Sequence, residues 1–222
     1  DCTFVGHPVL EGGADQGNGV DFRETNGIGP AETVICVLPG SRRGELKRLA
    51  EIFRQSAVEI VKKHPDAVFV FPTVSYLRER VSELAESWPG RTVVVSSITE
   101  KFDAMQACNV AMAASGTVSL ELAMARVPHL VAYRMNALTV WIVKLLYGLD
   151  QKYANLVNIL LDREIIKEFI QERCRSDLIA GKICELLDDH AVREEQLKLT
   201  ENALSTLRPE SGLPSDAAAS VV

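Results

Sequence analysis

Short apolar runs and amphipathic segments alternate along most of this chain. Residues 33–38 form a run of mainly β-branched side chains, which predicts a buried strand. In residues 45–64, apolar side chains recur at every third or fourth position, which places them on one face of a helix. The same alternation predicts strands at 67–71, 92–95, 109–113 and 129–133, and helices at 76–87, 100–107 and 118–125.

The predicted strands are apolar on both faces, because few polar residues interrupt them. Strands of this kind are typical of parallel sheets, in which the connecting helices cover both faces. The sequence therefore predicts an α/β fold with a doubly wound, Rossmann-like parallel sheet.

The pattern changes after residue 134, where the strands give way to helical spacing. We expect a helix at 137–147, an irregular stretch through 158, and further helices at 165–172, 178–187 and 192–207. The end of the chain holds two prolines, a glycine and small residues, so it predicts a frayed tail or a short closing helix.

The beginning of the chain has a different character. Residues 3–8 have the pattern of a strand end that runs into a turn, as in a chain whose front part is missing. Residues 11–30 are rich in glycine, which indicates a linker or loop. We therefore expect an interdomain segment with this loop at 1–30, one globular domain at 31–207 and the tail at 208–222.

Composition narrows the classes of protein to consider. With 222 residues and 47% hydrophobic side chains, one packed domain is expected. The net charge is −6, from 24 Lys and Arg against 30 Asp and Glu, which argues against nucleic acid as a partner. Five cysteines without a C-x-x-C pair indicate free thiols in a reducing cytoplasm. No apolar run is long enough to cross a bilayer, and no secretion signal opens the chain.

Ligands of open α/β sheets bind beyond the carboxyl ends of the strands, so the residues that follow each strand deserve most weight. After the first predicted strand come Gly40, Ser41 and Arg42. Glycine lets the backbone approach a ligand, serine offers a hydroxyl, and the arginine fork matches phosphate oxygens. An ordinary tight turn with solvated arginines explains these residues about equally well. The spacing is not that of a Walker phosphate-binding loop.

A second turn of this kind follows the predicted strand at 109–113. Ser115, Gly116 and Thr117 lead into a helix whose open amide groups carry partial positive charge and favour a diphosphate. Glu121 lies about one turn into that helix, where its carboxylate is able to accept hydrogen bonds from a ribose diol. An ordinary helix cap with an acidic first turn is the alternative. Two such turns on one sheet together favour a nucleotide or nucleotide-sugar ligand.

Several short blocks, in this order and spacing across almost the whole chain, carry a resemblance to one enzyme family. The chain resembles the C-terminal half of lipid-A-disaccharide synthase. The matching blocks are Gly6-His7-Pro8, Leu38-Pro39-Gly40-Ser41-Arg42 with Glu45, Ser115-Gly116-Thr117 with Glu121, Val131-Ala132-Tyr133-Arg134, and residues 155–160 followed by 164–171.

The resemblance implies a GT-B glycosyltransferase, built from two facing Rossmann-like domains with the active site between them. The family transfers 2,3-diacylglucosamine from its UDP donor to 2,3-diacylglucosamine 1-phosphate, which gives the β(1→6) disaccharide of lipid A and UDP. Residues 31–207 would then form the domain that binds the UDP donor. This donor half would be inactive alone, because the family's general base is expected in the N-terminal half.

Individual roles follow from the same resemblance. Arg42, next to Gly40 and Ser41, would face the diphosphate, while Ser115, Gly116 and Thr117 would wrap it. Glu121 would bind the ribose, and Asn158 would sit nearby. No cofactor or metal is expected, and the four histidines are scattered without metal-ligand spacing. Around Asn158 the chain has A-N-L-V-N where many relatives have V-S-L-P-N, so the loop lacks a proline.

The acylated substrates imply a peripheral position on the cytoplasmic face of the bacterial inner membrane. The predicted helix at 137–147 is apolar nearly all round, and Trp141, Lys144 and Tyr147 suit a lipid interface. Burial against another domain or a second subunit explains the same residues, so a homo-oligomer is also compatible.

Two other functions fit the sequence. A protein similar to UDP-N-acetylglucosamine 2-epimerase would share the architecture and the donor site but act on soluble sugars. A non-catalytic module for UDP binding or oligomerisation would need only the half that is present.

Overall fold

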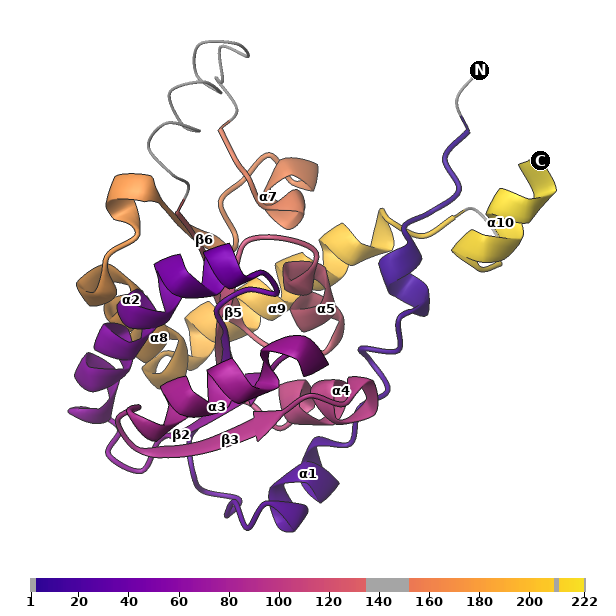
Figure 1. Ribbon diagram of the computed structural model, residues 1–222. Helices are drawn as coiled ribbons and strands as arrows, with labels where there is room; N and C mark the ends of the chain where they lie inside the picture. Colours follow the sequence, from indigo (N-terminus) through magenta and orange to yellow (C-terminus); the bar gives the residue numbers. More distant parts are fainter. Residues whose placement is uncertain (1–2, 135–151, 210–211, 222) are drawn as a thin grey trace.

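A six-stranded parallel sheet forms the centre of the computed structural model, which describes residues 3–134, 152–209 and 212–221 (Figure 1). The strand order is β3-β2-β1-β4-β5-β6, and every neighbouring pair is parallel. The predicted fold class is confirmed. The strands are β1 (Val34–Leu38), β2 (Val68–Pro72), β3 (Arg91–Val95), β4 (Val110–Ala114), β5 (His129–Tyr133) and β6 (Lys167–Ile170).

The chain reverses its direction of winding between β1 and β4. From β1 it proceeds outward to β2 and β3, and it then returns to the other side of β1 to add β4, β5 and β6. In register, Ile35 lies opposite Val110 and Leu38 opposite Ala113. The crossover helices diverge at such a switch point and leave a crevice at the carboxyl ends of the strands.

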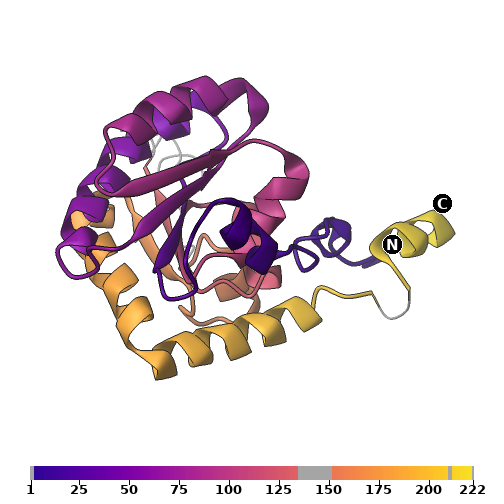
Figure 2. The same cartoon turned by 90° about the horizontal axis from the view of Figure 1, so that it is seen from below.

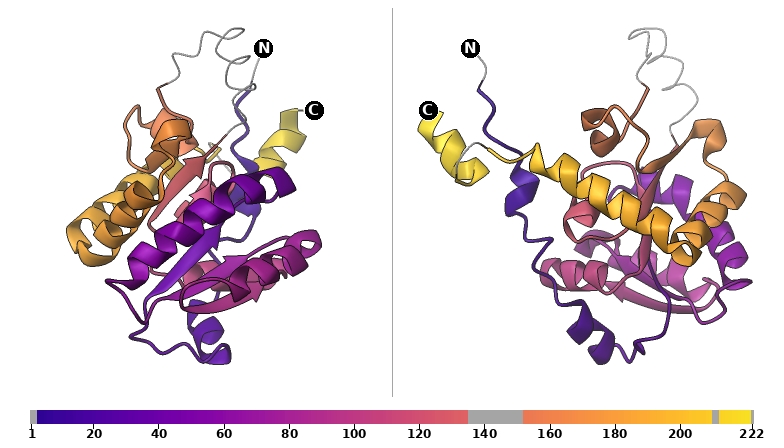
Figure 3. Two further views of the ribbon diagram at one scale, coloured as in Figure 1. Left: turned by 60° about the vertical axis from the view of Figure 1, so that its left-hand side comes forward. Right: turned by 180° about the vertical axis from the view of Figure 1, so that it is seen from behind.

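Helices cover both faces of the sheet (Figures 2 and 3). Alternate strand residues point to opposite faces: Ile35 and Val37 belong to one core cluster, and Val34 and Cys36 belong to two others. The first face packs against α2 (Arg43–Val61), α3 (Arg78–Glu86) and α8 (Ser176–Asp188). The second packs against α1 (Gly19–Thr25), α4 (Ile98–Gln106) and α5 (Val118–Met124), with α9 (His190–Ser205) lying against α5.

Four predictions of local structure were wrong. Residues 3–8 contain no strand end, because residues 3–7 are irregular and a 3-10 helix begins at Pro8. Residues 165–172 contain β6 and a 3-10 turn, η3 (Gln171–Arg173), because the short run K-E-F-I pairs with β5 and buries Phe169. The stretch expected to be irregular through 158 contains α7 (Leu156–Leu160), which Asn155 caps. The Gly-rich segment contains α1. The remaining short elements are η1 (Pro8–Glu11), η2 (Ser75–Leu77) and a closing helix, α10 (Pro214–Val221).

The Gly-rich segment is packed tightly against α4. A Cβ atom on Gly17 would overlap the backbone of Phe102, and one on Gly19 would overlap the backbone of Gln106. Between these two glycines, the Asn18 amide donates a hydrogen bond of 2.6 Å to the carboxylate of Asp103. The glycines are therefore required by close backbone contact, and the segment holds α4 in place.

The two ends of the described chain lie side by side (Figures 1 and 2). The amide of His7 donates to the carbonyl of Leu207 at 3.0 Å, and the Glu11 carboxylate accepts hydrogen bonds from Ser215. The predicted helix at 137–147 lies outside the described residues. Across the ranges that the structure describes, no helix has the length and apolar character needed to span a membrane.

Candidate functional site

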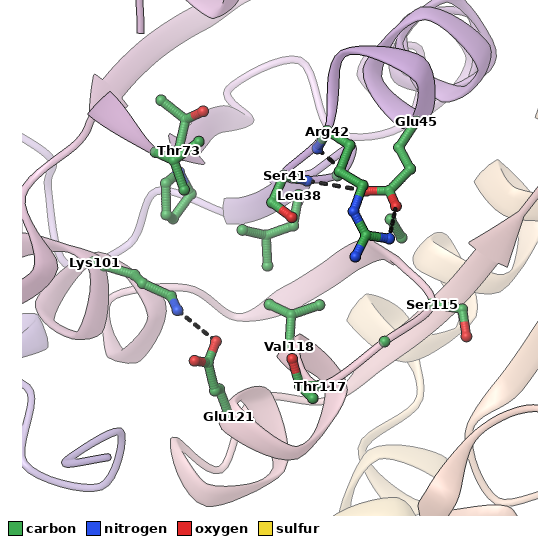
Figure 4. Close-up of a pocket in the computed structure, with 15 residues that line it drawn as sticks. Leu38, Ser41, Arg42, Glu45, Thr73, Lys101, Ser115, Thr117, Val118 and Glu121 are labelled. Carbon is green, nitrogen blue, oxygen red and sulfur yellow. Dashed lines mark hydrogen bonds and ion pairs between the residues drawn. The ribbon is translucent and has the colours of Figure 1, made fainter. Parts of the chain in front are cut away.

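A cavity of about 420 Å³ opens at the carboxyl ends of the central strands, and both predicted turns line it (Figure 4). The turn after β1 contributes one wall and the turn after β4 contributes the opposite one. The structure thus brings seven of the eight predicted site residues together: Gly40, Ser41, Arg42, Ser115, Gly116, Thr117 and Glu121.

The turn after β1 is held in shape by the glutamate of the following helix. Glu45 Oε2 accepts the backbone N–H groups of Ser41 at 3.1 Å and Arg42 at 3.3 Å. The Tyr76 hydroxyl donates to the Ser41 carbonyl from the other side. Gly40 has a φ of +117°, and a Cβ atom there would overlap Glu45. This turn accepts only glycine at position 40.

Arg42 extends from this turn over the cavity. Its Nη1 lies 3.3 Å from Glu45 Oε1, and 82% of its side chain is exposed. The exposed guanidinium keeps most of its N–H donors free for a ligand. Arg43, its neighbour, lines a different hollow between α2 and α3.

The turn after β4 presents a row of unused amide groups. Ser115 N donates to the Ala132 carbonyl at 3.0 Å, which anchors the turn to β5. Throughout the described part of the chain, the N–H groups of Gly116, Thr117 and Val118 have no hydrogen-bond acceptor. Gly116 has a φ of +152° and open space beside it. An anion placed here would meet three donors and the positive end of α5.

Glu121 and a lysine that the sequence analysis did not single out form an ion pair at the far end of the cavity (Figure 4). Lys101 Nζ lies 2.5 Å from Glu121 Oε2. Lys101 belongs to α4, the helix that follows β3. Inspection of every helix that follows a strand would have found it, since α4 also begins at the carboxyl edge of the sheet.

Asn158 does not line the cavity. It is fully buried, and its side-chain amide donates to the Ile166 carbonyl and to Glu168 Oε1, both at 2.7 Å. Its Oδ1 accepts the N–H groups of Ile165 and Ile166 at 2.8 and 2.9 Å. Its side-chain amide therefore joins α7 to β6 and to the two residues before that strand, and its expected place near the nucleotide stays a prediction.

A buried polar chain links α5 to the turn before α7. His129 Nε2 lies 2.7 Å from the Ser119 hydroxyl, which accepts a hydrogen bond of 2.7 Å from Asn155. The other ring nitrogen, Nδ1, donates to the Val127 carbonyl at 2.9 Å. Burial lowers the pKa of His129 to about 4, so the ring is neutral at pH 7. Neutral His129 fixes the helix that carries Glu121.

Metal ligands do not gather around this cavity. Within 3–134, 152–209 and 212–221, no group of three or more His, Cys, Asp or Glu side chains is arranged to hold a metal ion. The four cysteines in these ranges are free.

A doubly wound parallel sheet with a cavity at its switch point defines a Rossmann-like domain. The whole chain, residues 1–222, matches the sequence model of the lipid-A-disaccharide synthetase family. The chain belongs to this family. This membership decides against the epimerase alternative.

Individual comparisons agree with this assignment. A lipid-A-disaccharide synthase from Rhodospirillum centenum is 43% identical over 196 residues, which are 88% of this chain and 48% of that protein. The chain spans about half the length of the curated relatives it matches.

Solved structures show the same fold at low identity. WaaG, a glycosyltransferase involved in lipopolysaccharide biosynthesis, has a TM-score of 0.60 at 15% identity, over 91% of this chain and 50% of WaaG. The C-terminal domain of LpcC from Francisella tularensis, a glycosyl transferase group 1 family protein, has a TM-score of 0.54 at 15% identity. That comparison covers 85% of this chain and 92% of the LpcC domain.

Proposed function

We propose that this chain is the UDP-donor domain of a lipid-A-disaccharide synthase. In this reaction, 2,3-diacylglucosamine passes from its UDP donor to 2,3-diacylglucosamine 1-phosphate, and UDP is released. Family membership supports the reaction. One observation supports the site assignment most directly: the turns after β1 and after β4, which both offer hydrogen-bond donors suited to phosphate, line one cavity. Arg42 lies at one end of this cavity and Glu121 at the other.

The cavity of about 420 Å³ presents hydrogen-bond donors and an acceptor where a nucleoside diphosphate needs them. We place the diphosphate between the Arg42 guanidinium and the free amides of Gly116 and Thr117. The ribose diol then reaches the Glu121 carboxylate, which accepts hydrogen bonds but donates none. As the glycosidic bond to phosphate breaks, negative charge develops on UDP, and the same donors stabilise it without rearrangement.

The pocket supplies no free carboxylate to act as a base. Its two acidic residues in the described ranges are Glu45, which is held by Ser41 and Arg42, and Glu121, which is paired with Lys101. We therefore assign both to binding and assign neither to the removal of a proton from the attacking sugar hydroxyl.

The 222-residue chain is expected to bind UDP but to form no disaccharide, because it contains the donor site without a free base. Calorimetric titration with UDP and a product assay with acylated donor and acceptor test the two halves of this statement. We expect protein groups, rather than a metal ion, to stabilise the charge of the diphosphate. The UDP affinity is therefore expected to be equal in EDTA and in Mg²⁺. Disaccharide synthesis by the chain alone would contradict the proposal, as would a lack of UDP binding.

The same product assay decides between an enzyme and a non-catalytic module. It is applied to the longest gene product that contains this chain. Disaccharide formation there supports the proposal, and UDP binding without any transfer supports the module.

Arg42→Lys is expected to weaken UDP binding about tenfold, because lysine keeps the charge but lacks the bidentate fork. Arg43→Lys is the matched control, since Arg43 faces another hollow and its substitution is expected to leave the affinity within about twofold. Equal affinities for both variants and the wild-type chain would remove Arg42 from the site.

Glu121→Gln is expected to weaken UDP binding by about 1–3 kcal/mol, because a charged hydrogen-bond acceptor for the ribose is lost. The comparison ligand is 2′,3′-dideoxy-UDP, which lacks both hydroxyls. Its affinity is expected to change much less than that of UDP. An equal loss for both ligands would mean that Glu121 supports the fold rather than the ribose.

The acyl chains of the substrates lead us to propose a peripheral position on the cytoplasmic face of the inner membrane. Sedimentation of the chain with anionic and with neutral phospholipid vesicles tests this placement. Binding to neither would contradict it.

A further inference from the structure

The end of the cavity that holds Glu121 contains a second charged group, and its placement is specific. Lys101 Nζ and Glu121 Oε2 are 2.5 Å apart, and only 28% and 23% of these side chains are exposed. By contrast, the pair of Lys62 and Glu59 on α2 has a separation of 2.7 Å with 62% and 50% exposed. Reduced solvent screening makes the pair in the cavity the stronger interaction.

The pairing uses one oxygen of the carboxylate and leaves the other available. No hydrogen bond or ion pair to Glu121 Oε1 is found among the described residues. The contact through one oxygen restricts the rotation of the carboxylate, and the second oxygen stays available as an acceptor. A sugar hydroxyl is the kind of donor that such an acceptor requires.

The positive charge of Lys101 also reduces the repulsion between Glu121 and a bound diphosphate. A carboxylate beside a diphosphate site repels the incoming anion, and this repulsion is strong where solvent is scarce. Lys101 neutralises Glu121 locally. The cavity is therefore able to contain an acidic residue and still accept a dianion.

The tertiary structure holds Lys101 in this position. The Gly-rich segment packs against its helix, α4. Gly17 and Gly19 allow close backbone contact with this helix, and the backbone N–H of Asn18 donates a hydrogen bond to Asp103. The Lys101 ammonium also lies 5.2 Å from the centre of the Phe102 ring. Lys101 thus approaches Glu121 from a fixed helix rather than from a loop.

We propose that Lys101 is a positioning residue that sets the selectivity of the site for the ribose of the nucleotide. It orients and neutralises Glu121, so that ribonucleotides are preferred over nucleotides that lack the ribose hydroxyls. The proposal rests on the assignment of UDP to this cavity. Lys101 acts through Glu121 and makes no contact with the diphosphate.

The test is the ratio of the dissociation constants of 2′,3′-dideoxy-UDP and UDP, measured by calorimetry. The wild-type chain is expected to prefer UDP about tenfold or more. Lys101→Met keeps the apolar stem and removes the charge, so the preference is expected to fall to within about twofold. Lys101→Arg is expected to restore most of the preference. Lys62→Met, which breaks a lysine pair outside the cavity, is expected to leave the wild-type preference unchanged.

Each other outcome has a distinct meaning. A tenfold preference retained in Lys101→Met overturns the positioning role. An equal loss of affinity for both ligands, with the ratio unchanged, also overturns it and indicates a direct contact with phosphate. If Glu121→Gln abolishes the preference while Lys101→Met does not, the proposed function stands and this inference fails. If the wild-type chain does not bind UDP, both fail. Thermal unfolding of each variant checks that the fold is retained.

Discussion

Gly40→Ala is expected to weaken UDP binding by roughly 100-fold or more. At a φ of +117°, a residue with a Cβ atom is strained, and the added atom would overlap the Glu45 side chain. Glu45 holds the amides of Ser41 and Arg42, so its displacement releases the whole turn. The diphosphate then loses a pre-organised wall of its site.

Gly44→Ala provides the matched control for this result. Gly44 lies in the first turn of α2, where alanine is the better helix former, and the nearest atoms to a Cβ there would be those of the Arg48 guanidinium at 3.3 Å or more. We expect this variant to bind UDP like the wild-type chain and to unfold at an equal or higher temperature. Titration calorimetry measures the affinities. Wild-type affinity of the Gly40→Ala variant would show that the turn does not form the ligand site.

The free energy of unfolding is expected to fall by about 3 kcal/mol as the pH drops from 6.5 to 4, because His129 is buried as a neutral ring. Its pKa is about 4 in the folded chain and 6.5 in the unfolded chain. Between these values the unfolded chain binds more protons, so acid favours unfolding. The contribution of His129 is complete above pH 6.5 and is lost as the pH falls toward 4.

Urea unfolding at several pH values between 7 and 4.5 measures this slope. Carboxylates add slopes of their own, so the comparison with His129→Gln isolates the contribution of the histidine. The variant is expected to be less stable at pH 7 and to show a flatter dependence on pH. His190→Gln, at a side chain that is 75% exposed, is expected to keep the wild-type slope. Identical slopes for the wild-type chain and His129→Gln would refute the assignment.

The sequence predicts the strands β1 to β5 and their helices well. Burial on both faces produces unbroken apolar runs such as Val34–Leu38, and the partly exposed edge strand β3 still contains the apolar run of residues 93–95. It also predicts the two turns of the site, since glycine, hydroxyl and arginine side chains directly follow strands. Strand β6 was missed for a physical reason. Its four residues include Lys167 and Glu168, and the burial of Glu168 and Phe169 depends on pairing with a strand that lies far away in the chain.

The contents of the cavity are harder to predict than its location. Lys101 faces the cavity because the sheet brings α4 close to α5, and its place in a helix that follows a strand is the sequence signal for it. Asn158 shows the opposite case. A residue type that is common in binding sites serves here as a buried connector, which depends on Glu168 and Ile166 lying next to it in the folded chain.

The contact between the Gly-rich segment and α4 changes where this domain can be cut or extended. A chain shortened to begin at residue 31 would lose Phe22 and Ile28, which are 6% and 4% exposed and belong to the same cluster as Val34 and Val68. The outer face of α4 would then be bare apolar surface, and the helix that carries Lys101 would be held on its sheet side alone. A residue inserted between Gly17 and Gly19 would change their spacing, so that the two glycines would no longer both lie against the backbone of α4. The Gly-rich segment has the composition of a flexible linker, but it therefore tolerates insertions and deletions as poorly as the interior of the domain.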